Sequence, residues 1–154
     1  MLQDFGINMD KKLRGRLQAI IRKDFKKSKL YSDAEEKAKV DTKVYQCQCC
    51  KKYMYTGVSE KNFKAFQEKY EGIVAAEVTR SKSGVKRAKT MYELDHKEPA
   101  IPYDRYYYEV DMEEFVERVF CDINNLEVLC LNCHKEKTSK EKTIRSKYKK
   151  LRKK

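Results

Sequence analysis

Apolar residues recur at helical spacing in the first part of the chain, with lysines and arginines between them. From residue 9 to residue 29 these positions are Met9, Leu13, Leu17, Ile20, Ile21 and Phe25. This period predicts a basic amphipathic helix. Ser32 is placed to cap a second, shorter helix, rich in Ala, Glu and Lys, that ends near Val40.

The middle of the chain mixes short extended runs with turn signals. Residues 53–55 are typical of a short strand, and Ser59 is a suitable cap for a helix that stops at Gly72. One face of that helix carries Phe63, Phe66, Gln67 and Tyr70. Residues 79–90 are polar and basic around Ser83-Gly84 and are expected to form a loop.

Two short strands and two helices are predicted in the last third. Residues 91–96 alternate enough for a strand, and residues 128–130 indicate another. Asp111 and Glu114 have capping-box spacing at the start of an amphipathic helix. A final helix begins near Leu131 and runs into the basic tail. Helices interspersed with a few short strands predict an α+β fold.

Charge is unevenly spread over the 154 residues, whose formal net charge is +12. Residues 1–45, 80–89 and 135–154 carry net charges of +5, +5 and +9, whereas residues 90–128 carry −8. An acidic centre is thus flanked by basic arms. That pattern is expected of a polyanion binder, and it suits an enzyme that holds a divalent cation and a phosphate backbone together.

The chain is expected to be cytoplasmic. No apolar run approaches the ~20 residues of a membrane-spanning helix, and residues 1–8 include Asp4 and lack the apolar region of a signal peptide. In a reducing compartment, six cysteines suggest metal ligands before disulfides.

Two Cys-x-x-Cys pairs supply the four thiolates that a tetrahedral structural zinc needs, namely Cys47, Cys50, Cys130 and Cys133. The alternatives are disulfides or reduced, buried cysteines. Cys49 is a possible substitute for a neighbouring ligand, while Cys121 is expected to pack beside Phe120 as a small apolar residue.

A second constellation uses both histidines of the chain. It consists of Glu93-Leu94-Asp95-His96, then Pro99, then Asn124-Asn125-Leu126, then Leu129 to His134 and Lys137-Thr138. In this order and spacing it resembles the HNH nucleases, which have a ββα-metal core and in many members two zinc-binding Cys-x-x-Cys pairs. The resemblance covers about residues 45–140, and its specific motif covers residues 93–138.

The resemblance implies a metal-dependent endonuclease that hydrolyses DNA phosphodiesters. It makes His96 the general base, which suits an imidazole titrating near pH 6.5. Asp95 and His134 would hold a catalytic Mg²⁺ or Mn²⁺, with Ni²⁺ also acceptable to imidazole. Asn125, preferred to Asn124 for its position, would pin the loop beside His96 and orient its ring by an amide hydrogen bond.

Some features depart from the family or have other readings. Lys97 stands where an aliphatic residue is usual, a common glycine pair is missing, and residues 100–121 form an insertion with several tyrosines, which could stack on bases or simply pack. Adjacent strand residues point to opposite faces, so Asp95 and His96 can share one site only with a local twist. Two non-catalytic alternatives are that His134 replaces Cys133 as a zinc ligand and that His96 is a surface histidine beside Asp95.

The predicted organisation is a basic helical extension (1–44), an HNH domain (45–140) with an insertion at about 56–89, and a basic C-terminal helix or tail (141–154). The expected partner is DNA, which the resemblance to the family implies is double-stranded, with no membrane and no organic cofactor. Small HNH proteins resemble homing endonucleases of phages and mobile elements; restriction, genome packaging and a non-catalytic zinc module are alternatives. The residues expected to bind nucleic acid are Arg80, Lys82, Lys86, Arg87, Lys89 and Arg145.

Overall fold

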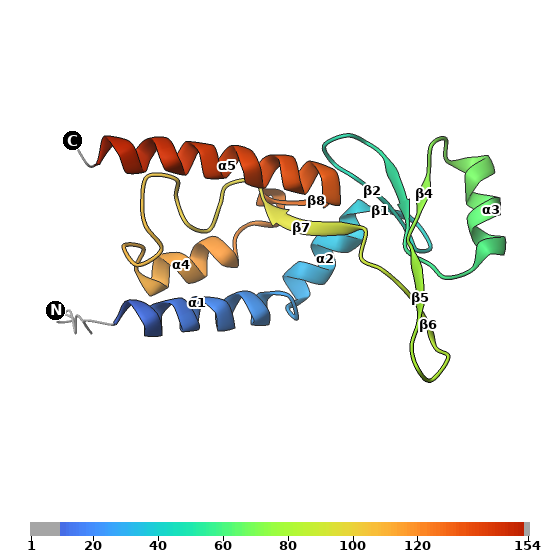
Figure 1. Ribbon diagram of the computed structural model, residues 1–154, viewed down its shortest axis with the longest axis horizontal. Helices are drawn as coiled ribbons and strands as arrows, with labels where there is room; N and C mark the ends of the chain where they lie inside the picture. Colours follow the sequence, from blue (N-terminus) through green and yellow to red (C-terminus); the bar gives the residue numbers. More distant parts are fainter. Residues whose placement is uncertain (1–9, 153–154) are drawn as a thin grey trace.

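The computed structural model describes residues 10–152 and has an α+β fold (Figure 1). Its helices are α1 (Lys11–Phe25), α2 (Lys29–Ala38), α3 (Glu60–Lys69), α4 (Met112–Val119) and α5 (Leu131–Leu151), with a short 3-10 turn η1 (Ile123–Asn125). Its strands are β1 (Lys39–Asp41), β2 (Val44–Gln46), β3 (Tyr53–Tyr55), β4 (Val74–Ala75), β5 (Val78–Arg80), β6 (Lys86–Ala88), β7 (Tyr92–His96) and β8 (Leu126–Cys130). Within the described part of the chain, no helix has the length and apolar character needed to span a bilayer.

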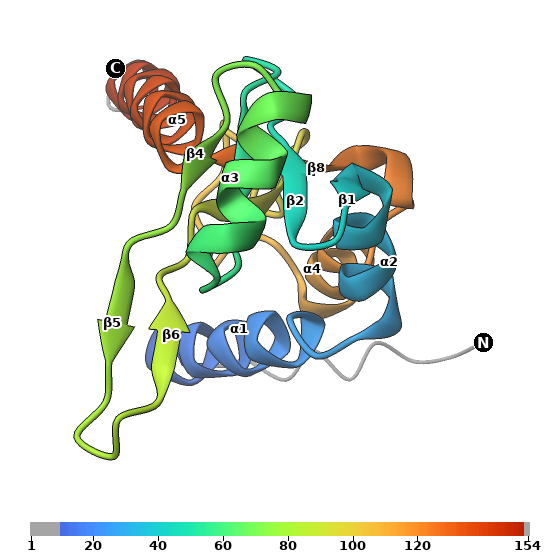
Figure 2. The ribbon, with the colours of Figure 1, turned by 90° about the vertical axis from the view of Figure 1, so that its right-hand side faces the viewer.

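The strands form three small sheets. A four-stranded sheet has the order β1-β2-β3-β4, and its last pair is parallel. The strands β5 and β6 form a separate hairpin that projects from the body in both views (Figures 1 and 2). The strands β7 and β8 pair antiparallel over five residues, from Tyr92 opposite Cys130 to His96 opposite Leu126. Because α5 begins directly after β8, two strands and a helix form one continuous unit.

The main hydrophobic core lies around β8. Val128, Val110 and Phe115 are fully buried, and Phe25 of α1 and Met54 of β3 belong to the same cluster. A smaller cluster lies between the four-stranded sheet and α3, and consists of Val44, Tyr55 and Ile73 with Tyr53, Phe63, Phe66 and Tyr70 packed against it. The β7–β8–α5 unit therefore packs, through this core, against α1, α2 and α4.

The first helix is basic, as predicted, but it buries only part of the expected apolar stripe: Phe25 is in the core and Ile21 packs against it. Leu13 and Ile20 are 48% and 55% exposed, whereas Gln18 is only 1% exposed and donates from Nε2 to the carbonyl of Tyr107 at 2.8 Å. Met9 lies outside the described residues. Tertiary packing against the 103–110 segment selects the face that contains Gln18, and a hydrogen bond satisfies its buried amide.

The cap of the second helix was predicted wrongly. Ser28, not Ser32, is the N-cap of α2, and its hydroxyl accepts a hydrogen bond from the Tyr31 N–H. Three other predictions of helix starts are confirmed. Ser59 caps α3, Asp111 caps α4, and α5 begins at Leu131. The capping box is only half formed, because Glu114 pairs with Arg105 and Arg118.

Residues 79–90 are not a simple loop. They contain most of the β5–β6 hairpin, in which Thr79 pairs with Arg87 and Arg80 with Lys86, and Gly84 adopts a φ of 80° in the turn. Polar side chains on both strands concealed the hairpin, because no alternation of apolar and polar residues marks a strand that buries neither face.

Candidate functional site

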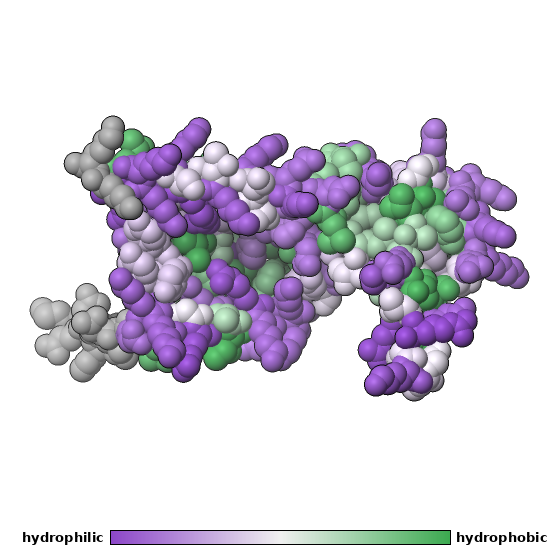
Figure 3. Space-filling view, in the orientation of Figure 1, coloured by the Kyte–Doolittle hydropathy of each residue, from purple (hydrophilic) through white to green (hydrophobic). Residues whose placement is uncertain are grey.

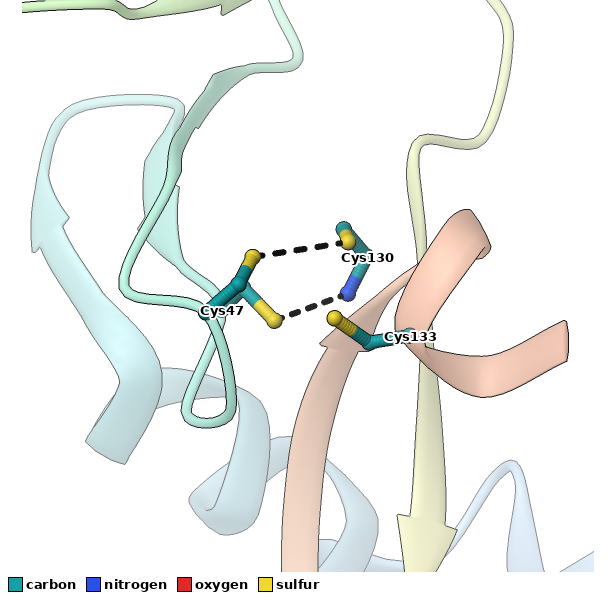
Figure 4. Close-up of side chains that lie close together, drawn as sticks. Cys47, Cys130 and Cys133 are labelled. Atoms are coloured by element: carbon teal, nitrogen blue, oxygen red, sulfur yellow. Dashed lines mark hydrogen bonds between the residues drawn. The ribbon is translucent and has the colours of Figure 1, made fainter. Parts of the chain in front are cut away.

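The four cysteines of the two Cys-x-x-Cys pairs meet in the structure. The sulfurs of Cys47, Cys50, Cys130 and Cys133 all lie within 4.8 Å of one another, although the pairs are far apart in sequence. Figure 4 shows Cys47, on the loop after β2, facing Cys130 and Cys133 at the junction of β8 and α5. In the described part of the chain this is the one group of three or more Cys, His, Asp or Glu ligand atoms gathered so closely.

Backbone hydrogen bonds position the first pair against β8. Gln48 donates its N–H to the carbonyl of Val128 at 2.9 Å, and its side-chain oxygen accepts from the Val128 N–H at 2.8 Å. Lys51 closes the turn with a positive φ of 62°. The knuckle formed by residues 47–52 is therefore attached to the strand that carries Cys130.

The chemistry of this cluster fits a cation. Burial alone would raise the pKa of the Cys47 thiol, but backbone N–H groups of Cys130 and of the knuckle donate to its sulfur and lower the pKa to about 7. Burial and the neighbouring thiols raise the pKa of Cys133. The Cys47 thiolate thus forms readily, while ionisation of Cys133 is favoured only by a nearby positive charge. The cluster could hold a zinc ion, which supplies that charge and prefers four thiolates.

Asp95 and His134 are close enough to share an ion. Asp95 is on β7 and His134 is in the first turn of α5, and their Oδ2 and Nε2 atoms are 3.9 Å apart. Ligand distances of roughly 2.1 Å for Mg²⁺ allow one ion to touch both atoms. Both side chains are accessible, with exposed fractions of 26% and 35%. Cys133 directly precedes His134, so the cysteine cluster and this pair are positioned by the same helix start.

Lys137 is a site residue to which the sequence assigned no role. Its ammonium donates to Asp95 Oδ2 at 2.9 Å, to Glu127 Oε1 at 3.0 Å and to the carbonyl of His96. Burial acts to lower the pKa of Lys137, but the two carboxylates outweigh it and raise the pKa above its ordinary value. The signal in the sequence was its spacing, since Lys137 follows His134 by three residues on one helix face.

His96 is held by contacts outside the motif. Its Nε2 lies 2.9 Å from the carbonyl oxygen of Val119, and its ring is 5.2 Å from that of Phe25. A carbonyl only accepts, so Nε2 is the protonated nitrogen and Nδ1 is the acceptor of the neutral ring. The helix α4, which lies within the predicted insertion, thereby fixes the tautomer of His96.

Asn125 pins the predicted loop but does not orient the imidazole. Its Oδ1 accepts from the Glu98 N–H at 2.9 Å and its Nδ2 donates to the Glu98 carbonyl at 3.3 Å, while its own carbonyl accepts from the Lys97 N–H. The expected amide hydrogen bond to the His96 ring is replaced by the Val119 carbonyl. Asn125 therefore fixes the backbone that follows His96.

Asp95 and His96 line one cavity despite being neighbours on a strand. His96 ends β7, and the Asp95 Oδ1 accepts from the His96 N–H at 2.8 Å. The cavity lies between this strand end, α1 and α5, and is also lined by Arg22, Ala100, Ile101 and Arg145. Both side chains thus reach one cavity at the end of the strand, with the β7–β8 register unbroken.

The residues expected to bind nucleic acid differ in their availability. Arg80, Lys82, Lys86 and Arg87 are exposed on the β5–β6 hairpin, whose surface is mostly hydrophilic (Figure 3). Lys89 at the base of the hairpin forms a 2.7 Å ion pair with Glu77. Arg145 donates to two backbone carbonyls instead of projecting into solvent.

The tyrosines of the insertion are packed rather than splayed. Tyr106 and Tyr108 stack with ring centroids 5.2 Å apart, with Lys11 of α1 over one ring and Arg152 of α5 over the other. These contacts favour a structural role that joins the two helices through the 103–110 segment.

Comparison with protein-family models, with curated proteins and with solved structures gave no match.

Proposed function

We propose that this protein is a metal-dependent endonuclease of the HNH type that hydrolyses DNA phosphodiester bonds. The observation that carries the proposal is the convergence of Asp95, His96 and His134 on the β7–β8–α5 unit. An antiparallel strand pair running into a helix is the order of elements in a ββα-metal core.

His96 would act as the general base. Its Nε2–H is committed to the Val119 carbonyl, so Nδ1 takes a proton from a water molecule. The oxygen of that water forms a bond to phosphorus while the bond from phosphorus to the O3′ atom breaks. The departing O3′ takes a proton from solvent water, so the products are a 5′-phosphate and a 3′-hydroxyl end.

Asp95 and His134 would hold the divalent cation. When bound, Mg²⁺ or Mn²⁺ supplies charge stabilisation for the phosphate and the departing oxygen. The Lys137 ammonium contacts Asp95 Oδ2, the oxygen that faces His134, and Asn125 fixes the backbone after His96. The four cysteines, with zinc, would fix the start of the helix that carries His134.

The basic hairpin supports double-stranded DNA as the substrate. Four cationic residues on an exposed two-stranded ribbon match a phosphate backbone, and a groove of B-DNA is wide enough to admit such a ribbon. We place the protein among homing-type endonucleases of phages or mobile elements, acting in the cytoplasm of the host cell. Restriction and genome packaging are the alternative settings.

A second candidate function is a non-catalytic zinc module that binds nucleic acid. It is favoured by the Lys137 ammonium, which lies 2.9 Å from the same Asp95 oxygen that a catalytic cation would use. This module needs the cysteines and the basic arms but not the imidazole of His96.

Plasmid nicking separates the two functions. The parent is expected to nick supercoiled DNA with Mg²⁺ or Mn²⁺, and His96→Ala to lose at least 100-fold of that rate, in the range typical of a general base. Lys135→Ala, on the exposed side of α5, serves as the matched control and should cleave like the parent. Equal cleavage by His96→Ala would rule out the mechanism, and DNA binding without cleavage by any variant would favour the module.

A further inference from the structure

The cavity beside Asp95 and His96 is bordered by two arginines from opposite ends of the described chain. Arg22 comes from α1 and Arg145 from α5, and both line an open cavity of about 200 Å³ at the end of β7. Figure 1 shows α1 and α5 on opposite sides of the segment that follows β7. The N-terminal helix, which lies outside the HNH resemblance, therefore contributes a charged wall to the candidate active site.

Arg145 is rigidly held. It donates to the carbonyls of Ile101 and Pro102 at 2.6 and 2.8 Å, and its guanidinium lies 5.3 Å from the centre of the Tyr103 ring. A guanidinium has five N–H donors in a fixed fork, so two carbonyls leave it further donors for an anion. Its orientation is fixed before any ligand arrives.

Arg22 has a different environment. Its guanidinium lies 5.1 Å from the centre of the Phe115 ring, its side chain is exposed, and within residues 10–152 no carboxylate is paired with it. Burial and the positive charge of Arg145 lower the pKa of Arg22. The like charges of Arg22 and Arg145 at one cavity favour an anion bound there.

The carboxylates at this cavity have other contacts. Asp95 pairs with Lys137 at 2.9 Å and faces His134, while Glu141 accepts from the Tyr103 hydroxyl at 3.4 Å. Within residues 10–152, neither carboxylate is hydrogen-bonded to Arg22 or Arg145. The two guanidinium groups therefore keep donors available for a ligand that brings its own oxygens.

We propose that Arg22 and Arg145 form a clamp for the non-bridging oxygens of the phosphodiester that is cleaved. This inference rests on the proposed function and adds two positioning residues to it, one of them from the N-terminal helix. The fork of a guanidinium matches the paired oxygens of a phosphate, and the cavity places that phosphate beside the His96 imidazole.

Kinetics of Arg22→Gln test the clamp. Loss of one phosphate donor at the reacting group is expected to lower kcat at least tenfold, since such donors contribute roughly 10²–10³ in rate, and Arg22→Lys should recover part of the loss. Lys23→Gln removes the same charge from the next position of α1 and should change kcat less than twofold. A loss confined to KM and equal in both variants would overturn the clamp. Arg145→Gln is less informative, because it also removes two hydrogen bonds to the backbone.

A binding measurement tests the clamp without cleavage. In protein without added Mg²⁺ or Mn²⁺, inorganic phosphate is titrated while the side-chain Nε–Hε resonances of the arginines are followed by NMR. The Arg22 and Arg145 resonances should shift saturably in the parent and in Lys23→Gln, and the Arg145 shift should be lost in Arg22→Gln. Absence of a saturable shift overturns the clamp. If the parent shows a saturable shift but never nicks DNA, the anion site is supported and the proposed nuclease activity is contradicted.

Discussion

At the scale of single residues, Asp95 has the most demanding environment. One of its oxygens accepts from the His96 N–H, and the other faces both the Lys137 ammonium and the His134 ring. A carboxylate oxygen has two lone pairs, so Lys137 and a cation can share it. Lys137 is therefore expected to organise the site whether or not a cation is bound.

Removal of the Lys137 ammonium should destabilise the fold. Lys137→Gln leaves Asp95 and Glu127 close together without their common partner, and we expect the free energy of unfolding to fall by about 1–3 kcal/mol, as for hydrogen bonds to charged groups. Urea denaturation provides the measurement. Lys140→Gln, an exposed position of the same helix, should stay within about 0.5 kcal/mol of the parent. An equal loss of unfolding free energy in both variants would show that the charge of the helix, and not the ion-pair network, determines the stability change.

Asn125 and Asn124 form a natural matched pair. Asn125→Ala removes two hydrogen bonds to the Glu98 backbone, each worth roughly 1 kcal/mol. If the loop positions His96, the nicking rate should fall by about tenfold or more. Asn124→Ala removes only an exposed contact with Lys37 and should leave the rate within twofold. The reverse order of effects would assign the supporting role to Asn124.

At the scale of elements, the knuckle at residues 47–52 joins β2 and β3 to the β8–α5 junction. Gln48 provides the two hydrogen bonds to Val128, and the cysteine cluster provides the remaining link. The fold has no long sheet at this position, because β2 and β3 have only three residues each. A metal tie at the junction is therefore expected to contribute strongly to stability.

Zinc removal should test that contribution. We expect one zinc per chain by elemental analysis, and chelation should lower the melting temperature by roughly 10 °C or more, because metal binding adds to folding free energy. Cys50→Ser should reproduce the loss of metal, while its exposed neighbour Cys49→Ser should retain it. Metal loss in Cys49→Ser alone would identify Cys49 as the ligand.

At the scale of the whole molecule, a basic arm, the β5–β6 hairpin, projects from the body. The β5–β6 hairpin carries Arg80, Lys82, Lys86 and Arg87, and neither of its faces is packed against the body, as the exposure of Val78 and Val85 shows. An isolated two-stranded hairpin is only marginally stable in water. We therefore expect DNA to order the arm as well as to bind it.

The salt dependence of DNA affinity measures the contribution of the β5–β6 hairpin to binding. Arg80→Gln with Arg87→Gln should weaken binding to duplex DNA of any sequence and reduce the slope of log K against log salt by up to about 1.8, or 0.9 per lost phosphate contact. Lys61→Gln with Lys64→Gln removes the same charge from the exposed face of α3 and should leave the slope nearly unchanged. An equal decrease in both pairs would indicate only a general charge effect.

Local sequence determined the features that rest on near neighbours. The caps at Ser59 and Asp111, the strand ending at His96 and the helix starting at Leu131 follow from residue preferences and short-range periodicity. The two Cys-x-x-Cys spacings likewise identified the thiols that meet in the cluster. The chemistry of a two-residue spacing is local, so the tertiary fold had only to bring two ready pairs together.

The tertiary structure decided what lies around those residues. The Val119 carbonyl that holds His96, the Lys137 ammonium at Asp95 and the approach of Arg22 to Arg145 join elements that are distant in sequence. The buried face of α1 was also decided there, because Gln18 finds a carbonyl on the 103–110 segment while Ile20 faces solvent. Packing and partner availability set these outcomes, and neither is encoded in the spacing of a single segment.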